Sequence, residues 1–448
     1  TFKIILMTKQ YNWNRKNILQ QPEWSDTALL SNILKQIKEY PNLVFINEIN
    51  YLRQQLLFAA KGEKFILQGG DCAETFNDFS EGAIKNKIKI ILQMSAIIQY
   101  TTTLNVVTIG RIAGQFAKPR SQKNEEREGV ILPSYRGDAI NDLEFSDKGR
   151  HANPKRLLRV YHQSAATMNL IRSLMMEGFT HFNNIKSWKL SFLDKSSNVE
   201  RYNTIANKIK EALKFAQLSN IKNSDIQNNF FISHEALLLE YEEAFLNYSL
   251  HEKNYYNCSS HMIWIGDRTR NINDAHIEFA SQIINPIGVK IGPSIDIEEI
   301  VPLCKKLNPN NELNKLILII RMGAKKISKI LPKLITKVKK HELNVIWMCD
   351  PMHGNTIILD NGIKTRDFNT IKLELEQFFS IHNLEGTIPA GVHFELTGED
   401  VTECLGGVNK IKNSDLNHFY NTACDPRLNY EQSLEMAFLI SNFLQNRR

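Results

Sequence analysis

The segment Phe65-Ile66-Leu67-Gln68-Gly69-Gly70-Asp71 shows a pattern that the rest of the chain repeats. A short apolar run, typical of a buried strand, ends abruptly in glycine, polar and charged residues. Seven further runs of this kind follow, at Asn105–Ile109, Phe230–Ile232, Met262–Ile265, Gly288–Ile291, Leu316–Ile320, Val345–Met348 and Val392–Leu396. Helical patterns lie between most of them. Eight strands with intervening helices predict an α/β fold, a (β/α)8 TIM barrel, while an open doubly wound sheet stays open as an alternative.

Helical patterns also lie outside this repeat, and they predict the domain organisation. Residues 1–62 are expected to form an N-terminal helical extension, with Ser25 capping a helix that Pro41 stops and a second helix ending near Gly62. Residues 63–448 would form the catalytic barrel, closed by a helix around Tyr430–Leu444. The connection between the second and third strands is too long, and a helical insertion is predicted at about 150–226, with apolar stripes around Leu157–Met175 and Tyr202–Leu213. Met7 is a candidate start, which would make residues 1–6 an upstream extension.

Composition limits the classes of function. The 448 residues carry a net charge of +7 that is spread along the chain, which suits anionic small substrates and gives little support to nucleic-acid binding. Six cysteines without a CxxC pair suggest a reducing compartment, and we expect a cytoplasmic protein. No apolar run approaches the roughly 18 residues that span a membrane.

The residues at the strand ends fall into two chemical sets, and in a barrel all of them would face the active site. One set is cationic and suits phosphate or carboxylate ligands, although each member could instead pair with a neighbouring carboxylate. The other resembles the ligands of a divalent transition metal such as Mn, Fe, Co or Zn. Its cysteine could also be an ordinary buried thiol, and its last aspartate could simply begin a turn. The cations are Arg111, Lys118, Arg120, Arg268, Lys290 and Arg321, and the metal-ligand set is Cys72, His353, Glu395 and Asp425.

Long motifs then identify a family. LQGGDCAETF, RIAGQFAKPRS, LPSYRGDAIN, YHQSAAT, SHEALLLEYE, WIGDRTR, GVKIGPS, RMGAKKI, WMCDPMHGNT, GVHFELTGEDVTECLGG and TACDPRLNYEQSLEMAFLIS stand in this chain. Together they resemble class II 3-deoxy-D-arabino-heptulosonate 7-phosphate (DAHP) synthases, from about Gln20 to the C-terminal helix. One motif departs from the family, because Asp267 replaces the usual Glu of WIGERTR.

The resemblance implies a site and a reaction. The metal would be held by Cys72, His353, Glu395 and Asp425. Phosphoenolpyruvate would be held by Arg111, Asp267, Arg268, Lys290 and Arg321, and erythrose 4-phosphate by Lys118, Arg120 and Ser121. Lys290, Asp267 and Lys118 are the expected catalytic residues, acting around the water and the alkoxide of a metal-assisted condensation.

The family also implies a setting and leaves rivals open. The reaction would be the first step of the shikimate pathway to aromatic amino acids. The family further implies a homo-oligomer and aromatic amino acids as effectors. A sister synthase using an amino-sugar or other aldose phosphate would need the same motifs. A ligand-binding regulator without activity is disfavoured, since every presumed ligand is present.

Overall fold

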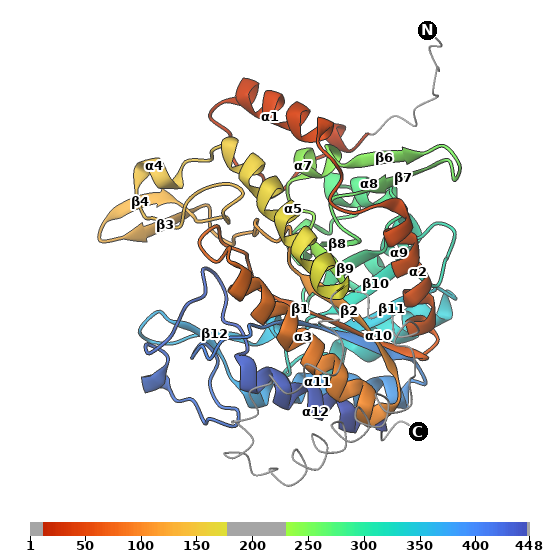
Figure 1. The fold of residues 1–448 in the computed structure, drawn as a ribbon. Coiled ribbons are helices and arrows are strands. Elements are labelled where there is room, and N and C mark those ends of the chain that lie inside the picture. Colours follow the sequence, from red (N-terminus) through yellow and green to blue (C-terminus); the bar gives the residue numbers. More distant parts are fainter. Residues whose placement is uncertain (1–11, 177–229, 446–448) are drawn as a thin grey trace.

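A closed barrel of eight parallel strands forms the centre of the protein, and the computed structural model describes it within residues 12–176 and 230–445 (Figure 1). Around the barrel the strand order is β1, β14, β11, β10, β9, β8, β5, β2. The strands are β1 (Lys64–Gly70), β2 (Asn105–Arg111), β5 (Phe230–Glu235), β8 (Met262–Ile265), β9 (Ile287–Ile291), β10 (Leu316–Ile320), β11 (Ile346–Cys349) and β14 (Pro389–Glu395). Each predicted run coincides with or overlaps one of them. The predicted (β/α)8 barrel is confirmed, and closure of the sheet excludes the doubly wound alternative.

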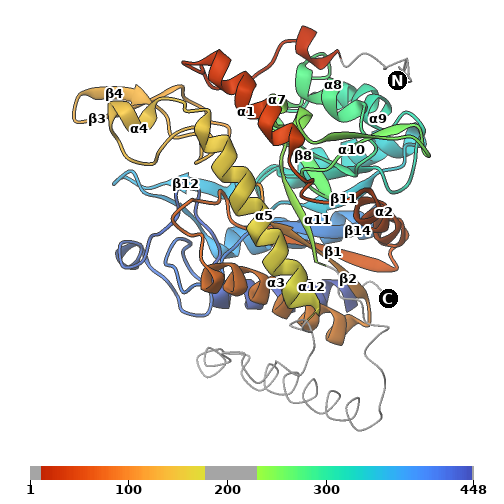
Figure 2. The ribbon, with the colours of Figure 1, turned by 45° about the horizontal axis from the view of Figure 1, so that its top comes forward.

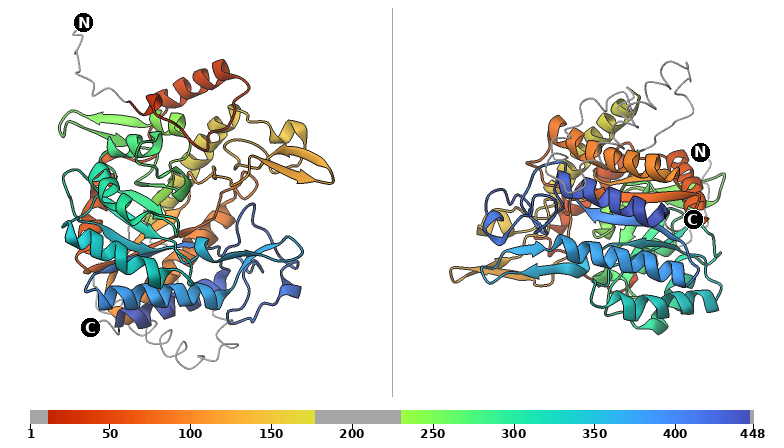
Figure 3. Two further views of the ribbon diagram at one scale, coloured as in Figure 1. Left: turned by 180° about the vertical axis from the view of Figure 1, so that it is seen from behind. Right: turned by 90° about the horizontal axis from the view of Figure 1, so that it is seen from below.

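Helices cover the outside of the barrel in sequence order. They are α3 (Glu81–Thr102), α8 (Ala275–Ser281), α9 (Ile300–Leu307), α10 (Ile327–Lys340), α11 (Phe368–Leu384) and α12 (Tyr430–Gln445). From α8 to α12 each helix packs on the next, and α12 also packs on α3, which closes the row (Figure 3). None of the described helices is long and apolar enough to cross a membrane.

Alternation along the strands separates two apolar layers. On β10, Ile317 and Ile319 point into the barrel, whereas Leu316, Leu318 and Ile320 pack in the layer beneath the helices. The same alternation turns polar residues inward at the carboxyl end of other strands, such as Lys290 on β9. The active-site end of the barrel is therefore lined by every second residue of strands that are otherwise apolar.

The N-terminal helices α1 (Thr27–Glu39) and α2 (Ile46–Ala60) precede the first strand. The side chain of Asp26, and not the predicted Ser25, caps α1 by accepting a hydrogen bond from the Leu29 amide at 2.8 Å. Both residue types cap helices well, and the observed helix simply begins one residue later. Leu52 and Leu56 of α2 pack against the inward-facing strand residues, so this helix closes the amino end of the barrel.

The predicted insertion is described only in its first part, as helix α5 (Lys155–Met176). Its buried residues Leu157 and Tyr161 pack with α1, and Ile171 joins the apolar layer outside the strands (Figure 2). The second predicted helix, Tyr202–Leu213, lies outside the described residues. The boundaries 1–62, 63–448 and 150–226 stay predictions.

Hairpins and short helices decorate the barrel. They are β3 (Asn124–Arg127) with β4 (Val130–Pro133), β6 (Leu246–Ser249) with β7 (Asn254–Asn257), β12 (Thr356–Ile358) with β13 (Lys364–Arg366), α4 (Asp147–Arg150) and α7 (Leu239–Glu243). The hairpins β3–β4 and β12–β13 follow the carboxyl ends of β2 and β11 and project from the same end of the barrel (Figures 1 and 3). They frame the end where the polar residues gather.

Candidate active site

Three side chains with metal-binding atoms converge at the carboxyl end of the barrel. Ligand atoms of His353, Glu395 and Asp425 all lie within 4.8 Å of one another. Glu395 is the last residue of β14, His353 begins a 3-10 turn after β11, and Asp425 comes from the segment between β14 and α12. Three of the four predicted ligands, far apart in sequence, therefore meet in one place.

The protonation state of His353 fits a cation site in this group. Nδ1 of His353 lies 2.7 Å from Asp350 Oδ2, and the carboxylate can only accept, so Nδ1 carries the ring proton. Burial lowers the pKa of His353, and the imidazole is neutral with a bare lone pair on Nε2. That lone pair faces Glu395 Oε1 at 3.0 Å. A cation held by both residues would remove the repulsion between these two electron-pair donors, and the residues fit a divalent cation.

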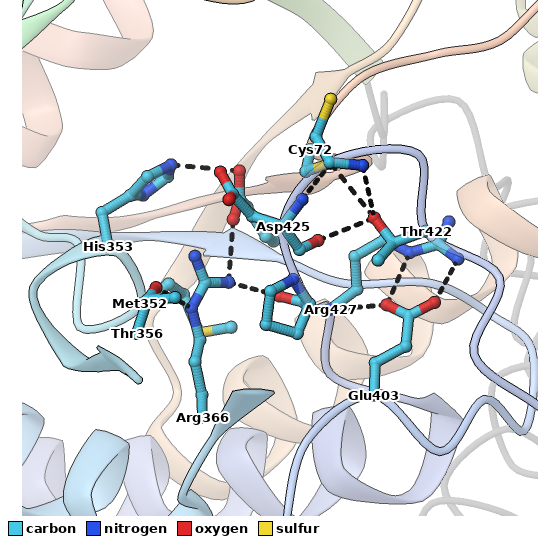
Figure 4. Close-up of polar contacts among 12 residues, drawn as sticks. Cys72, Met352, His353, Thr356, Arg366, Glu403, Thr422, Asp425 and Arg427 are labelled. Atoms are coloured by element: carbon cyan, nitrogen blue, oxygen red, sulfur yellow. Dashed lines mark hydrogen bonds and ion pairs between the residues drawn. The ribbon is translucent and has the colours of Figure 1, made fainter. Parts of the chain in front are cut away.

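Cys72, the fourth predicted ligand, lies beside the group on the Asp425 side. Its sulfur accepts a hydrogen bond from the backbone amide of Asp425 at 3.3 Å and lies 3.4 Å from Thr422 Oγ1 (Figure 4). Burial would raise the pKa of Cys72, but a hydrogen bond with Cys424 and the charge of Lys118 lower it to about 6. The thiolate, which is the metal-binding form, is therefore favoured at neutral pH.

Two buried cations lie against these carboxylates. Arg111 donates from Nη2 to Glu395 Oε1 at 3.1 Å and from Nε to the Asp71 carbonyl at 3.0 Å. Lys118 Nζ lies 2.5 Å from Asp425 Oδ2 and 3.3 Å from Glu395 Oε1. Burial opposes the charge of Lys118, but Asp425 and its other anionic neighbours raise its pKa well above the usual value. Lys118 thus pairs directly with two carboxylates of the metal-type group, by which we mean His353, Glu395 and Asp425.

Lys290 enters from β9 on the other side of His353. Its Nζ pairs with Asp350 Oδ2 at 3.0 Å and lies 5.7 Å from the Trp264 ring centroid. Burial lowers the pKa of Lys290 to about 8, against the opposing charge of Asp350. A lysine with such a pKa can give or take a proton near neutral pH.

Arg321 and Asp267 form a second, partly exposed group at this end of the barrel. Asp267 Oδ2 accepts from Arg321 at 3.0 Å, and Asp267 Oδ1 accepts from the Gly292 amide at 2.9 Å. Arg321 Nη2 also donates to the His353 carbonyl at 3.2 Å, which joins this group to the metal-type residues.

Arg268, Arg120 and Ser121 lie at the outer edge. Arg268 is exposed and donates to Ser121 Oγ at 2.7 Å, whereas Arg120 pairs with Glu125 at 2.9 Å. The salt-bridge alternative thus applies to Arg120, which stays partly exposed beside a glutamate five residues away. It applies equally to the other predicted cations that pair with a carboxylate, namely Arg111, Lys118, Lys290 and Arg321.

Several functional side chains were not singled out from the sequence. Asp350 orients both His353 and Lys290, and its position three residues before His353 was a readable signal. Burial would raise the pKa of Asp350, but His353 and Lys290 hold it well below its usual range. Glu235 ends β5, and no described residue hydrogen-bonds its buried Oε1. Because alternation turns Ser233 and Glu235 inward, strand periodicity would have found the latter.

His393 orients the guanidinium group of Arg111 through a hydrogen bond. Its Nε2 accepts from Arg111 Nη1 at 2.5 Å, so its Nδ1 donates to Gln68 Oε1 at 2.7 Å. Gln68 in turn donates to Ser233 at 2.8 Å. This chain of buried polar groups fixes the guanidinium of Arg111 beside Glu395.

Comparison with known proteins identifies the family of the chain. A model of the class-II DAHP synthetase family matches residues 8–441. The chain belongs to the class-II DAHP synthetase family. A relative from Streptomyces coelicolor, named phospho-2-dehydro-3-deoxyheptonate aldolase, is 45% identical over 435 residues, which are 97% of each chain. A relative from Neurospora crassa with the same name is 42% identical over 457 residues, covering 98% of this chain and 94% of its own.

Membership in the class-II DAHP synthetase family makes the chain an enzyme of the transferase class, as the motifs had suggested. The match extends over the barrel, the N-terminal helices and α12, so it covers every element that contributes to the site.

Proposed function

We propose that the protein is a metal-dependent DAHP synthase. It would condense phosphoenolpyruvate, D-erythrose 4-phosphate and water into DAHP and inorganic phosphate, the first step of the shikimate pathway to aromatic amino acids. The observation that carries the proposal is the meeting of His353, Glu395 and Asp425 within 4.8 Å, beside three buried cations, in a chain of this family. Metal-type ligands and anion-binding groups in one place suit an aldehyde and two phosphorylated substrates.

The metal would be held by Cys72, His353, Glu395 and Asp425. A mixed sulfur, nitrogen and oxygen set suits Mn, Fe, Co or Zn, and the favoured thiolate of Cys72 adds a soft ligand. Such an ion supplies Lewis acidity toward the aldehyde oxygen when it is bound.

The cations divide between the two substrates. Arg111, Lys290 and Arg321, with Arg268 and Asp267, would bind the carboxylate and phosphate of phosphoenolpyruvate, because guanidinium groups bind such oxygens in pairs. Lys118, Arg120 and Ser121 would face the erythrose phosphate. The buried contacts of Arg111 and Lys290 keep these groups in place before substrate arrives, which lowers the entropic cost of alignment.

The residues then handle the charges and protons of the condensation. C3 of phosphoenolpyruvate forms the new bond to the aldehyde carbon, and the aldehyde oxygen gains a proton. Water adds to C2 and loses one proton. The remaining C2 hydroxyl becomes the ketone as the C2–O bond to phosphate breaks, and its proton leaves with the phosphate. Lys290, with a pKa of about 8, is the group best matched to proton transfer at neutral pH, and Asp267 and Lys118 are the other candidates.

A phosphoenolpyruvate-consumption assay with a panel of aldose phosphates tests the proposal. We expect turnover with erythrose 4-phosphate, loss of turnover after exhaustive chelation, and recovery on adding Mn²⁺ or Co²⁺. Cys72→Ser should lose most of the activity because a hydroxyl stays protonated and binds metal poorly. Full activity of this variant after chelation would remove metal dependence from the proposal, and turnover with only another aldose phosphate would replace the substrate.

The setting of the enzyme follows from the same family. We infer a cytoplasmic homo-oligomer with aromatic amino acids as effectors. All six cysteines are unpaired thiols in the structure, as a reducing compartment would keep them. Initial rates with phenylalanine, tyrosine and tryptophan, alone and combined, test the effectors, and sedimentation tests the oligomer.

A further inference from the structure

The loop 422–427, which carries Asp425, belongs to no strand of the barrel. Leu428, the first residue after the loop, connects it to the barrel, because its amide donates to the Glu395 carbonyl at 3.0 Å. Asp425 therefore reaches the other ligands at the end of a connection, where backbone pairing fixes it less firmly than Glu395 on β14.

Arg427 ties this loop to the segment that bears Cys72. Arg427 is 5% exposed, and its Nη1 donates to Asp71 Oδ1 at 2.6 Å. Asp71 directly precedes Cys72, and Arg427 follows Asp425 by two residues. One buried ion pair thus joins two ligand-bearing segments that are 356 positions apart in the chain, counted between the paired residues.

The other donors of Arg427 are all directed at Glu403. Nε donates to Glu403 Oε2 at 3.0 Å, Nη2 donates to Oε1 at 2.7 Å, and the backbone amide donates to Oε2 at 2.7 Å (Figure 4). This two-pronged contact fixes the plane of the guanidinium, which a flexible ammonium group could not reproduce. The direction of Nη1 toward Asp71 is therefore set before any metal binds.

Asp71 has a second cationic neighbour that does not bridge the ligands. Lys87 lies 2.5 Å from Asp71 Oδ2 and belongs to α3, so it links Asp71 to the outer helix layer. Lys87 and Arg427 are both buried and both pair with the same carboxylate. They differ in what they connect to Asp71. Removing Lys87 should therefore cost only a buried charge pair, whereas removing Arg427 should also change the spacing of the ligands.

We propose that Arg427 is a positioning residue of the metal site: by tying the loop of Asp425 to the segment of Cys72, it sets the spacing of these two ligands. The inference rests on the proposed metal site and adds a residue that does not touch the ion. Groups that orient metal ligands typically change metal affinity about 10–100-fold when they are lost.

Cobalt(II) titration of the metal-free full-length protein tests the inference, because the thiolate–cobalt bond gives its own absorption band. Arg427→Met should weaken cobalt affinity about 10–100-fold and reduce the thiolate band at saturation. Lys87→Met, which removes the other cation of Asp71, should stay within about threefold of the wild type in affinity and keep the band. Arg427→Lys, which retains a charge near Asp71 without the fork to Glu403, should lie between the two.

Any other outcome of the titration contradicts a specific part of the proposal. Wild-type affinity and band in Arg427→Met would overturn the role of Arg427, and so would equal weakening by Lys87→Met. If Arg427→Met does not fold, Arg427→Lys decides in the same way, with thermal unfolding of the metal-free protein as the check on folding. A wild-type protein that binds no cobalt through a thiolate would instead overturn the proposed metal site, and the inference with it.

Discussion

Asp350→Asn is the perturbation that the structure defines most closely outside the metal ligands. The carboxylate accepts from His353 Nδ1 at 2.7 Å and pairs with Lys290 Nζ at 3.0 Å, and it is fully buried. It also accepts from the backbone amides of Met352 and His353, at 3.1 and 3.2 Å. The asparagine keeps the size of the side chain and loses the charge that fixes the tautomer of His353.

The expected magnitude follows from these contacts. A carboxylate that orients a metal-binding histidine typically changes metal affinity about 10–100-fold, which is on the order of 1.4–2.8 kcal/mol. The loss of the ion pair with Lys290 adds to the effect, because a buried ammonium group is left without its main partner. We therefore expect the loss of metal affinity to lie near the larger end of this range, about 100-fold. At saturating metal, turnover should remain reduced, since Lys290 is no longer held in place.

Competition against a chromophoric chelator measures the affinity, and phosphoenolpyruvate consumption at saturating metal measures turnover. Asp360→Asn is the matched control, since this exposed aspartate lies in the turn between β12 and β13. It should leave both quantities unchanged. If Asp350→Asn bound metal within twofold of the wild type, the assignment of His353 as an oriented ligand would be refuted.

Four further predictions follow from the site and the barrel. Arg321→Ala should raise the KM for phosphoenolpyruvate much more than that for erythrose 4-phosphate, because it removes paired contacts to one substrate. If initial rates show the reverse pattern, the two substrates are assigned to the wrong anion sites. Asp267→Glu should keep activity with an altered KM for phosphoenolpyruvate, since the longer carboxylate displaces its arginine partner, and complete inactivation would show that the site depends on the shorter side chain. Burial lowers the pKa of Lys315 to about 7, so above that pH the folded chain binds fewer protons than the unfolded chain. The wild type should then gain stability relative to Lys315→Met from about pH 7 to 10, by up to about 1.4 kcal/mol per pH unit, and parallel stability profiles in denaturant unfolding would contradict this. Air oxidation of the metal-free protein should join Cys72 and Cys424, whose thiols are hydrogen-bonded, and mass spectrometry that finds both thiols free would end the idea.

The sequence predicted the barrel because its strands carry a strong local signal. Runs such as Leu316–Ile320 are apolar on both faces, as strands enclosed by helices and a packed interior must be. The exact start of a helix was harder to predict, because Ser25 and Asp26 are adjacent and cap helices equally well. Closure of the sheet also had to come from the structure, since it depends on strand tilt and register.

The site was predicted as far as residue type at strand ends allows. His353, Glu395 and Asp425 come together as expected, because their motifs follow buried strands or resemble the family. Arg427 and Asp71 were not predicted as partners, since their ion pair joins distant positions and leaves no periodic trace. Such buried pairs depend on how loops fold over the barrel, and a single sequence does not encode this in a local pattern.

One measurement tests the central claim most directly. The purified protein, stripped of metal and then supplied with Mn²⁺, is incubated with phosphoenolpyruvate and erythrose 4-phosphate, and DAHP and phosphate are quantified together. We predict equal amounts of DAHP and phosphate, formed only when metal and both substrates are present. Phosphate release without DAHP, or equal turnover in the stripped protein, would contradict the proposed reaction.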